Sequence, residues 1–262
     1  MKVKGDGIFS INTSASGGFG SAGISLPETV ADAGGGGGDN PPITTDLLVY
    51  YNPDVEAYSD AGTTLAVDGD NIRQFNDQSG NGNTLNQPTA SVQPLYDTTT
   101  FSGGLASIKS IYDSLIPTSE LDFDNSTSWT FYHVYKKESN SNIYYWFRGT
   151  VGYPRTEHLT TKFQIRGDTG SGRSVSYTDN TDIKIMAITV DRSADEFKMY
   201  INGSYIGASS TSVTNWPVTI GQLYGNGNAI MNVGNVLFYT AAHDATDVGT
   251  VSDWLNEKYQ IY

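Results

Sequence analysis

Strand-length runs of apolar and aromatic residues, separated by turn clusters, are the feature of this sequence that most limits its fold. From Ile43 onward these runs alternate with short clusters of Gly, Asn, Asp, Ser and Thr. In "WTFYHVYK" (129–136) alternate residues fall on opposite faces of a strand, so Trp129, Phe131, His133 and Tyr135 share one face. Such runs indicate an antiparallel sandwich or barrel. We therefore predict an all-β chain.

The same pattern predicts further strands, one hairpin and one helix. The further strands are "IYYWFR" (143–148), "DIKIMAITVD" (182–191), "EFKMYINGSYIG" (196–207) and "VGNVLFYTAA" (233–242). The third of these breaks at Asn202-Gly203, where Gly readily supplies the positive φ of a tight hairpin turn. A short C-terminal helix is expected after Asp244, which can cap it. Its apolar stripe comprises Val248, Val251, Leu255 and Tyr259.

Composition excludes several classes of function. The 262 residues carry a formal net charge of -13 and show no Lys/Arg cluster, which disfavours binding to nucleic acid. The absence of Cys excludes disulfides, thiolate metal sites and cysteine nucleophiles, and it leaves the compartment open. The sequence after "MKVKGDGIFSINTS" has no apolar run long enough for a signal peptide or a spanning helix. Standard secretion and a membrane partner are therefore disfavoured.

The first 42 residues differ from the rest of the chain. They contain few large apolar side chains, so they cannot offset the entropy of ordering a core of their own. Gly34 to Gly38 form a flexible joint, and Pro41 and Pro42 stiffen the entry to the next segment. We predict a Gly-rich anchoring arm and linker over residues 1–42. A single sandwich domain is predicted over residues 43–262.

The order of four stretches resembles the laminin-G-like, concanavalin A-like jelly rolls of many bacterial and bacteriophage surface proteins. These stretches are "LLVYYNPD" followed by "IRQFNDQSGNGNTLNQP", then "STSWTFYHVYK", then "FKMYINGSYIG", and finally "VGNVLFYTAAHDATDVGTVSDWLNEKYQIY". In the family, an aromatic residue, a polar residue and Asp precede a Ser-Gly-Asn-Gly turn, as Phe75, Asn76 and Asp77 do here. Trp is more usual where Phe75 stands. The resemblance implies an antiparallel jelly-roll sandwich over roughly residues 43–262, but this fold hosts lectins, hydrolases and inert spacers.

The loop "FNDQSGNGNTLNQP" (75–88) has two interpretations. Asn and Gly tolerate left-handed backbone, and Asp, Asn and Ser side chains hydrogen-bond nearby amides, so the loop can form a compact turn without apolar packing. Alternatively, Asp68, Asp70 and Asp77 place oxygens around Ca²⁺, which some relatives of this fold bind. The turn is favoured, because Ser79 stands where an EF-hand loop beginning at Asp68 would need its closing Glu. No other cofactor is expected.

One stretch resembles a catalytic motif of glycoside hydrolases. Laminarinase-type relatives carry Glu-x-Asp-x-Glu on a strand, and "ELDFD" places Glu120, Asp122 and Asp124 at these positions. Asp124 is one methylene too short, and the stretch runs directly into "NSTS", so we expect a solvated loop here. The histidines His133, His158 and His243 form no metal-binding spacing. No Ser lies in a G-x-S-x-G elbow. We predict a non-enzymatic protein.

Aromatic residues of one predicted strand are candidates for sugar binding. Lectins stack an aromatic face on a sugar ring while polar groups bond its hydroxyls. In "IYYWFR", Tyr144, Trp146 and Arg148 share one face, opposite Ile143, Tyr145 and Phe147. The pattern does not choose which of the two faces is exposed, because sandwich cores also need aromatic residues.

The arm favours a role in assembly. Its short apolar clusters comprise Ile8, Phe9, Phe19, Ile24 and Leu26, which can dock on a partner, although a simply disordered arm is the alternative. The resemblance implies a bacteriophage decoration, knob or fibre protein. The leading hypothesis is a virion structural protein, held on the capsid or tail by the arm and displayed on the virion surface. The alternative is a carbohydrate-binding adhesin that recognises host glycans from an extracellular or bacterial cell surface. A glycoside hydrolase ranks third, and a homo-oligomer is compatible with each.

Overall fold

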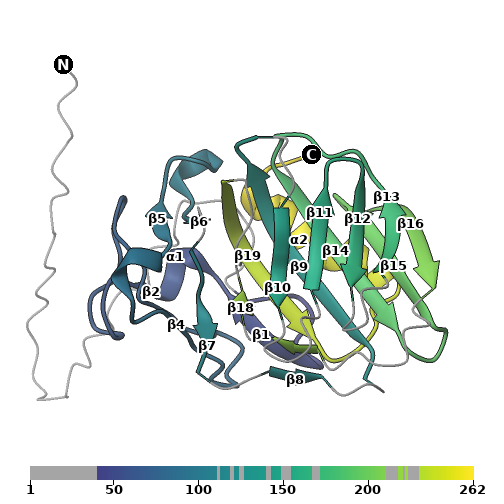
Figure 1. The fold of residues 1–262 in the computed structure, drawn as a ribbon, viewed down its shortest axis with the longest axis horizontal. Coiled ribbons are helices and arrows are strands. Elements are labelled where there is room, and N and C mark those ends of the chain that lie inside the picture. The colour runs from purple at the N-terminus through teal and green to yellow at the C-terminus, as the bar shows by residue number, and fades with distance from the viewer. Residues whose placement is uncertain are drawn as a thin grey trace, which may run out of the picture. The chain divides into compact units, whose positions relative to one another are not determined.

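A computed structural model describes the backbone of most of the chain after the predicted arm. The described residues are 40–110, 113–118, 121–123, 127–139, 143–148, 155–166, 172–210, 218–220, 222–223 and 230–262. The five arm residues predicted to anchor the chain, from Ile8 to Leu26, lie outside them. In the described ranges the chain forms antiparallel sheets and one helix longer than a single turn, so the predicted β-sandwich with a C-terminal helix is confirmed (Figure 1).

Eight of the described strands form the largest sheet. Its order is β16-β15-β14-β9-β19-β6-β5, and β1 pairs with the second half of β19. The strands are β1 (Leu47–Tyr51), β5 (Leu95–Asp97), β6 (Ser107–Ser110), β9 (Trp129–Lys137), β14 (Lys184–Asp191), β15 (Glu196–Ile201), β16 (Ser204–Ser210) and β19 (Met231–Tyr239). The predicted turn joins β15 to β16, with φ of 51° at Asn202 and 72° at Gly203. Positive φ at both residues is typical of a two-residue hairpin turn, so this prediction is confirmed.

A second sheet of five described strands covers one face of the large sheet. Its order is β13-β12-β11-β10-β18, with β10 (Ile143–Arg148), β11 (Arg155–Leu159), β12 (Lys162–Arg166), β13 (Gly172–Ser176) and β18 (Gln222–Leu223). Phe163, Ile165 and Val175 pack in one core with alternate residues of β9, β14 and β15. At one edge the sheets approach closely, because a Cβ on Gly207 would lie 2.9 Å from Cγ1 of Val175. These contacts make the two sheets a sandwich.

Shorter elements complete the described chain. A four-stranded sheet comprises β2 (Ala57–Tyr58), β3 (Gln74–Phe75), β4 (Leu85–Asn86) and β7 (Ile116–Pro117). The short helices are α1 (Pro53–Glu56), η1 (Ala90–Val92) and η2 (Ser102–Gly104). In "ELDFD" the predicted loop is wrong at β8 (Leu121–Phe123), which pairs with β17 (Val218–Ile220). The reason is visible in the sequence, since Leu121 and Phe123 alternate with a polar residue as in a strand. Glu120 and Asp124 lie outside the described residues.

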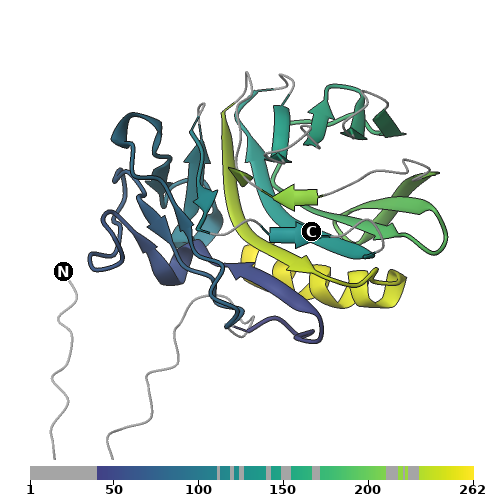
Figure 2. The same cartoon turned by 60° about the horizontal axis from the view of Figure 1, so that its bottom comes forward.

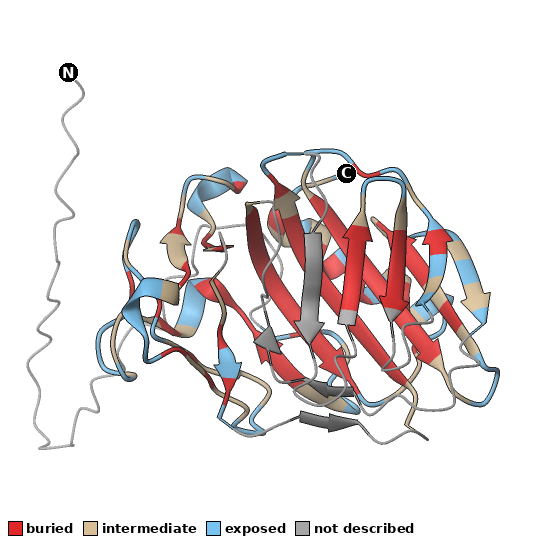
Figure 3. Cartoon of the chain, in the orientation of Figure 1, coloured by how far each residue is buried: buried red, intermediate tan, exposed pale blue. Residues whose placement is uncertain are grey.

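The helix α2 (Ala245–Tyr259) packs on the other face of the large sheet (Figure 2). The predicted cap is confirmed, because Oδ1 of Asp244 accepts hydrogen bonds from the amides of Thr246 and Asp247 at 2.7 and 3.0 Å. The predicted apolar stripe is buried as a whole. The large sheet therefore lies between α2 and the second sheet, and both faces of β9, β14 and β19 are buried (Figure 3).

A bulge in β19 fixes the position of α2. The pairing of β19 with β9 shifts by one residue between Val233 and Val236. The hydroxyl of Tyr259 enters this bulge, where it accepts from the amide of Asn235 at 3.0 Å and donates to Oδ1 of the same residue at 2.9 Å. Gly234 permits this approach, because a Cβ there would lie 2.5 Å from the Tyr259 hydroxyl. No helix among the described residues has the length and apolar character needed to span a membrane.

Candidate functional site

The aspartates considered for calcium each hold backbone groups. The carboxylate of Asp77 accepts hydrogen bonds from the amides of Tyr50, Ser79 and Asn83 at 2.9 to 3.0 Å, which ties the loop of residues 75–88 to β1. The carboxylates of Asp68 and Asp70 accept from Thr98 and Val67, respectively. Within the described ranges, no group of three or more His, Asp or Glu side chains is placed to hold a metal ion. Calcium binding at these aspartates stays a prediction.

The predicted sugar-binding strand is present as β10. The register places Tyr144 opposite Glu157 and Arg148 opposite Arg155. The side chains of Tyr144, Trp146 and Arg148 lie outside the described residues, so sugar binding by this face also stays a prediction. Opposite Tyr144, the carboxylate of Glu157 is buried and accepts a hydrogen bond from the side-chain amide of Gln164.

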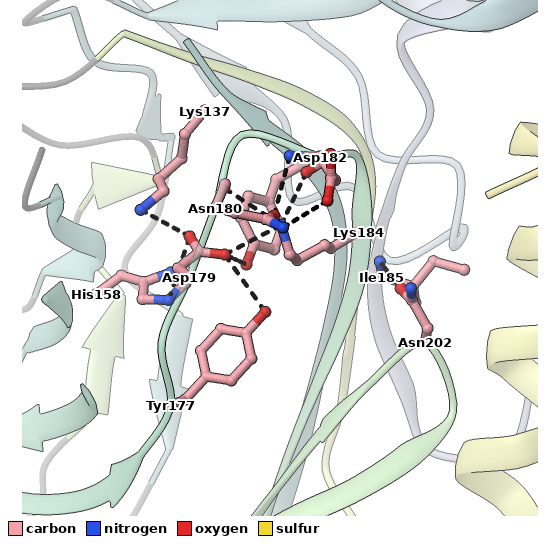
Figure 4. A network of polar contacts seen from close by, with 10 residues as sticks. Lys137, His158, Tyr177, Asp179, Asn180, Asp182, Lys184, Ile185 and Asn202 are labelled. Atoms are coloured by element: carbon pink, nitrogen blue, oxygen red, sulfur yellow. Dashed lines mark hydrogen bonds and ion pairs between the residues drawn. The ribbon is translucent and has the colours of Figure 1, made fainter. Parts of the chain in front are cut away.

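A buried ionic network joins the two sheets (Figure 4). Asp179 lies at its centre, with Oδ2 2.7 Å from Nζ of Lys137 in β9 and Oδ1 3.2 Å from Nζ of Lys184 in β14. Lys184 also donates to the backbone carbonyl of Asp182 at 3.0 Å and to the side chain of Asn180. Burial opposes ionisation of Asp179, yet its interactions with His158, Lys137 and Lys184 lower the pKa of its carboxyl below the ordinary value. Asp179 therefore stays charged inside the sandwich.

Two tyrosines and a histidine complete this network. The hydroxyls of Tyr135 and Tyr177 donate to Oδ1 of Asp179 at 3.2 and 3.3 Å. Nε2 of His158, in the second sheet, lies 3.4 Å from Oδ2 of Asp179. Burial lowers the pKa of His158 from 6.5 to about 4, so the imidazole is neutral at neutral pH. Because Lys137 and His158 are fully buried, this network braces the two sheets and cannot receive a ligand.

An open polar cleft lies on the opposite face of the same large sheet, beside the N-terminus of α2. The register of β14 and β15 sets its floor, with Thr189 beside Lys198 in one row and Asp191 beside Glu196 in the next. On β16, Ala208 and Ser210 continue these two rows into the adjoining depression. The segment leading into α2 adds Ala242, His243 and Asp244. The cleft has a volume of about 130 Å³, and a shallower depression of about 430 Å³ adjoins it at Glu196.

An exposed tyrosine lies in the neighbouring row of the same face. Tyr205 pairs with Tyr200 across β15 and β16, and the two rings meet edge to face with centroids 5.6 Å apart. Tyr205 is 58% exposed, whereas Tyr200 is buried. Tyr200 occupies the row next to Lys198, because alternate residues of a strand share a face. The cleft therefore has polar walls and an aromatic neighbour.

Two buried polar side chains of the cleft have unmet hydrogen-bonding capacity. Thr189 is 3% exposed, and its hydroxyl has no hydrogen-bond partner among the described residues. His243 is 7% exposed, and its Nδ1 lies 2.7 Å from the Tyr132 hydroxyl, but its Nε2 has no such partner in the described chain. Both atoms border the open cleft and are not sealed in the interior, so a donor or acceptor that enters the cleft can reach them. These two groups are therefore the first candidates to contact a ligand.

The charged groups of the cleft are partly engaged with one another. Nζ of Lys198 lies 3.0 Å from Oε2 of Glu196. Hydrogen bonds from Ser193 and Ala194 lower the pKa of Asp191, against the effect of its partial burial. Hydrogen bonds from the helix amides lower the pKa of Asp244. Burial lowers the pKa of His243 below its ordinary value, although nearby carboxylates oppose the shift. The cleft thus offers three carboxylates, one ammonium and a neutral imidazole near neutral pH.

Comparisons with known proteins identify the fold. The sequence matches no family model and no curated protein. The structure is similar to the binding domain of Paraclostridial mosquitocidal protein 1, at 14% identity and a TM-score of 0.55, over 79% of this chain and 52% of that one. It is similar to the binding domain of botulinum neurotoxin serotype D, at 11% identity and a TM-score of 0.56, over 80% and 51%. It is also similar to the ligand-binding domain of botulinum neurotoxin serotype D in complex with N-acetylneuraminic acid, at 11% identity and a TM-score of 0.53, over 80% of this chain and 51% of that one. The chain thus spans about half the length of these chains.

Sequence reasoning missed the residues of this cleft. Thr189 and Lys198 lie in segments that are predicted as strands, but that prediction depends only on the apolar residues of these segments. The available signal is the polar alternation in "ITVD" and "EFKMY", which places Thr189, Asp191, Glu196 and Lys198 on one face of a hairpin. His243 carries no comparable signal, because its position depends on the path of the chain between β19 and α2.

Proposed function

We propose that the sandwich is a non-enzymatic domain that binds a surface glycan, with the cleft beside α2 as its binding site. The observation that carries this proposal is the pair of unpartnered polar groups, the Thr189 hydroxyl and His243 Nε2, in one cleft. Sugar hydroxyls donate and accept hydrogen bonds at once, so one ring can satisfy both groups. The likeness to domains solved as binding domains, one of them with a bound sugar acid, supports a binding role.

The size of the cleft fits the edge of one sugar unit. Pockets for drug-sized ligands measure ~300–1,000 Å³, so a cleft of about 130 Å³ admits only part of such a ligand. The adjoining depression can receive the neighbouring units of a chain. Tyr205 is placed to stack on an apolar sugar face, as lectin aromatics do.

Binding is favoured over hydrolysis by the state of the carboxylates. A glycosidase needs a general acid whose pKa is raised, together with a second carboxylate. Hydrogen bonds hold the pKa of Asp191 and of Asp244 below the ordinary value, so neither is suited to be the proton donor near neutral pH. The third carboxylate, Glu196, is paired with the ammonium of Lys198 at 3.0 Å, an interaction that favours its charged form. The cleft therefore suits recognition of a glycan without its cleavage.

A glycan array followed by calorimetry tests this function. The full chain is screened first, and the best glycan is titrated into wild type, Lys198→Ala and Tyr205→Ala. Both variants alter exposed side chains, so we expect folded proteins with at least tenfold weaker binding. Tyr262→Ala, at an exposed tyrosine that does not line the cleft, is the control and should bind as wild type does. A chain that binds no glycan, or binds it equally well in both cleft variants, would contradict the proposal.

Display of the domain on a virion is a second proposal, and the composition of the arm supports it. Residues 1–42 have too few large apolar groups to fold alone, and a run of five glycines joins them to the sandwich. We expect deletion of residues 1–40 to leave a soluble sandwich that binds the same glycan but no longer joins the particle. Undiminished incorporation of the shortened chain would exclude this role of the arm.

A further inference from the structure

The charges of the cleft narrow the class of its ligand. Its lining contains the carboxylates of Asp191, Glu196 and Asp244, and the ammonium of Lys198. Lys198 is already paired with Glu196 at 3.0 Å, so its charge is largely compensated. His243 adds no positive charge, since burial lowers the pKa of its imidazole below the ordinary value. An incoming carboxylate would therefore meet an excess of negative charge and no free cation.

The carboxylates also present free acceptor atoms. Oδ1 of Asp191 accepts from the amide and hydroxyl of Ser193 at 2.8 and 2.7 Å, while its Oδ2 has no hydrogen-bond partner among the described residues. Oε2 of Glu196 pairs with Lys198, and its Oε1 likewise has no partner within the described chain. In both carboxylates, one oxygen is engaged within the protein and the other can accept a hydrogen bond from a ligand.

Donors that suit these oxygens are sugar hydroxyls and amines. Hydrogen bonds to an ionised acceptor are the stronger kind, and a hydroxyl or ammonium supplies them without adding negative charge. Thr189 and His243, deeper in the cleft, complete a lining that is rich in acceptors. We infer that the ligand is a non-acidic sugar, either uncharged or carrying an amine, and that sialylated and uronic-acid sugars are rejected. This inference rests on the proposed function and concerns the same cleft.

The inferred ligand differs from the sugar acid of one structural neighbour. That protein was solved in complex with N-acetylneuraminic acid, a sugar with a carboxylate. Identity of 11% leaves room for a different lining on the same fold. The lining of this cleft, with three carboxylates against one paired lysine, is the feature that separates the two ligand classes.

The test uses two pairs of related probes whose members differ in charge. Calorimetry with the full chain uses N-acetyllactosamine, its sialylated form, a chitin oligosaccharide and the corresponding amine-bearing chitosan oligosaccharide. We expect binding of at least one uncharged or amine-bearing probe, and at least tenfold weaker binding of the sialylated form. Comparing the chitin and chitosan probes shows whether an amine adds affinity.

A charge-removing variant links this preference to the cleft. Glu196→Gln removes one negative charge and frees Lys198, so we expect the discrimination against the sialylated probe to fall several-fold. Glu257→Gln makes the same change on the exposed surface of α2 and should leave the discrimination unchanged. Tighter binding of the sialylated probe by wild type, lost in Lys198→Ala, would overturn the inference. Failure of these four probes and of every glycan on the array to bind would instead overturn the proposed function, and this inference with it.

Discussion

The two faces of one sheet use the same residue types in opposite ways. Between the sheets, Asp179 is surrounded by Lys137, Lys184 and His158, and each charge finds its counterpart inside the protein. On the α2 side, the cleft also combines Asp, Lys and His, yet Thr189 and Nε2 of His243 have no partner in the described chain. Whether polar groups are paired within the protein therefore distinguishes a structural network from a binding site better than residue type does.

The network is buried and the cleft is open to solvent, and this difference determines how much each contributes to the free energy of unfolding. A buried ion that loses its partner keeps the full cost of desolvation, whereas an exposed pair is screened by water. The network should therefore dominate stability, and the cleft should contribute to it only weakly.

Removal of the charge at the centre of the network should have the largest effect. Asp179→Asn leaves the fully buried Lys137 without a counter-ion, so we expect the free energy of unfolding to fall by about 3–5 kcal/mol. Glu138→Gln is the matched control, because it breaks the partly exposed pair with Lys109 and should cost at most about 1 kcal/mol. Chemical denaturation measures both, and equal losses would remove the contrast.

Acid should destabilise the protein through the network. The unfolded chain binds a proton at His158 below about pH 6.5, whereas burial lowers the folded pKa to about 4. The contribution of the neutral His158 to the free energy of unfolding is therefore fully present above pH 6.5. It is lost as the pH falls from 6.5 to about 4, which lowers this free energy by about 3 kcal/mol. His133 adds to the loss, because burial lowers the pKa of its imidazole well below 6.5. Denaturation at a series of pH values should show a shallower slope in His158→Gln, and an unchanged slope would refute this assignment.

The C-terminal end of α2 is in close contact with β19. A Cβ on Gly234 would lie 2.5 Å from the Tyr259 hydroxyl, so Gly234→Ala should displace α2 and cost about 1–3 kcal/mol. Gly249→Ala is the control within α2 itself, since nothing lies within 4 Å of its Cβ position. That substitution should stabilise the helix by up to about 1 kcal/mol. A Gly234→Ala protein as stable as wild type would show that α2 is not held at this point.

Local patterns in the sequence suffice to predict much of the fold. The turn at Asn202-Gly203 and the cap at Asp244 depend on neighbouring residues only, and both are confirmed. The long strands are predicted because their apolar residues recur with the period of a strand. The strand β8 differs from this prediction, because its alternation covers only three residues beside a turn cluster and its partner β17 lies far along the chain.

The candidate site needs information that the sequence does not contain. Alternation shows that Thr189 and Lys198 share a face, but not that His243 closes the cleft above them. The pairing of Lys137 with Asp179 likewise joins two segments that only the packing of the sheets brings together. Whether a hydroxyl is paired is a property of the folded chain, and this property separates the cleft from the network.

Two threonines side by side on neighbouring strands differ in whether their hydroxyls are paired within the protein. Thr130 and Thr189 pair across β9 and β14, but the hydroxyl of Thr130 donates to the carbonyl of Ala241 and accepts from the amide of His243, both at 2.8 Å. The measurement is the stability and glycan affinity of Thr130→Val and Thr189→Val. We predict that Thr130→Val lowers the free energy of unfolding by about 1–3 kcal/mol. Thr189→Val should change this free energy by less than about 0.5 kcal/mol while weakening glycan binding at least tenfold. A Thr189→Val protein that is destabilised like Thr130→Val, or binds glycan as wild type does, would contradict the account.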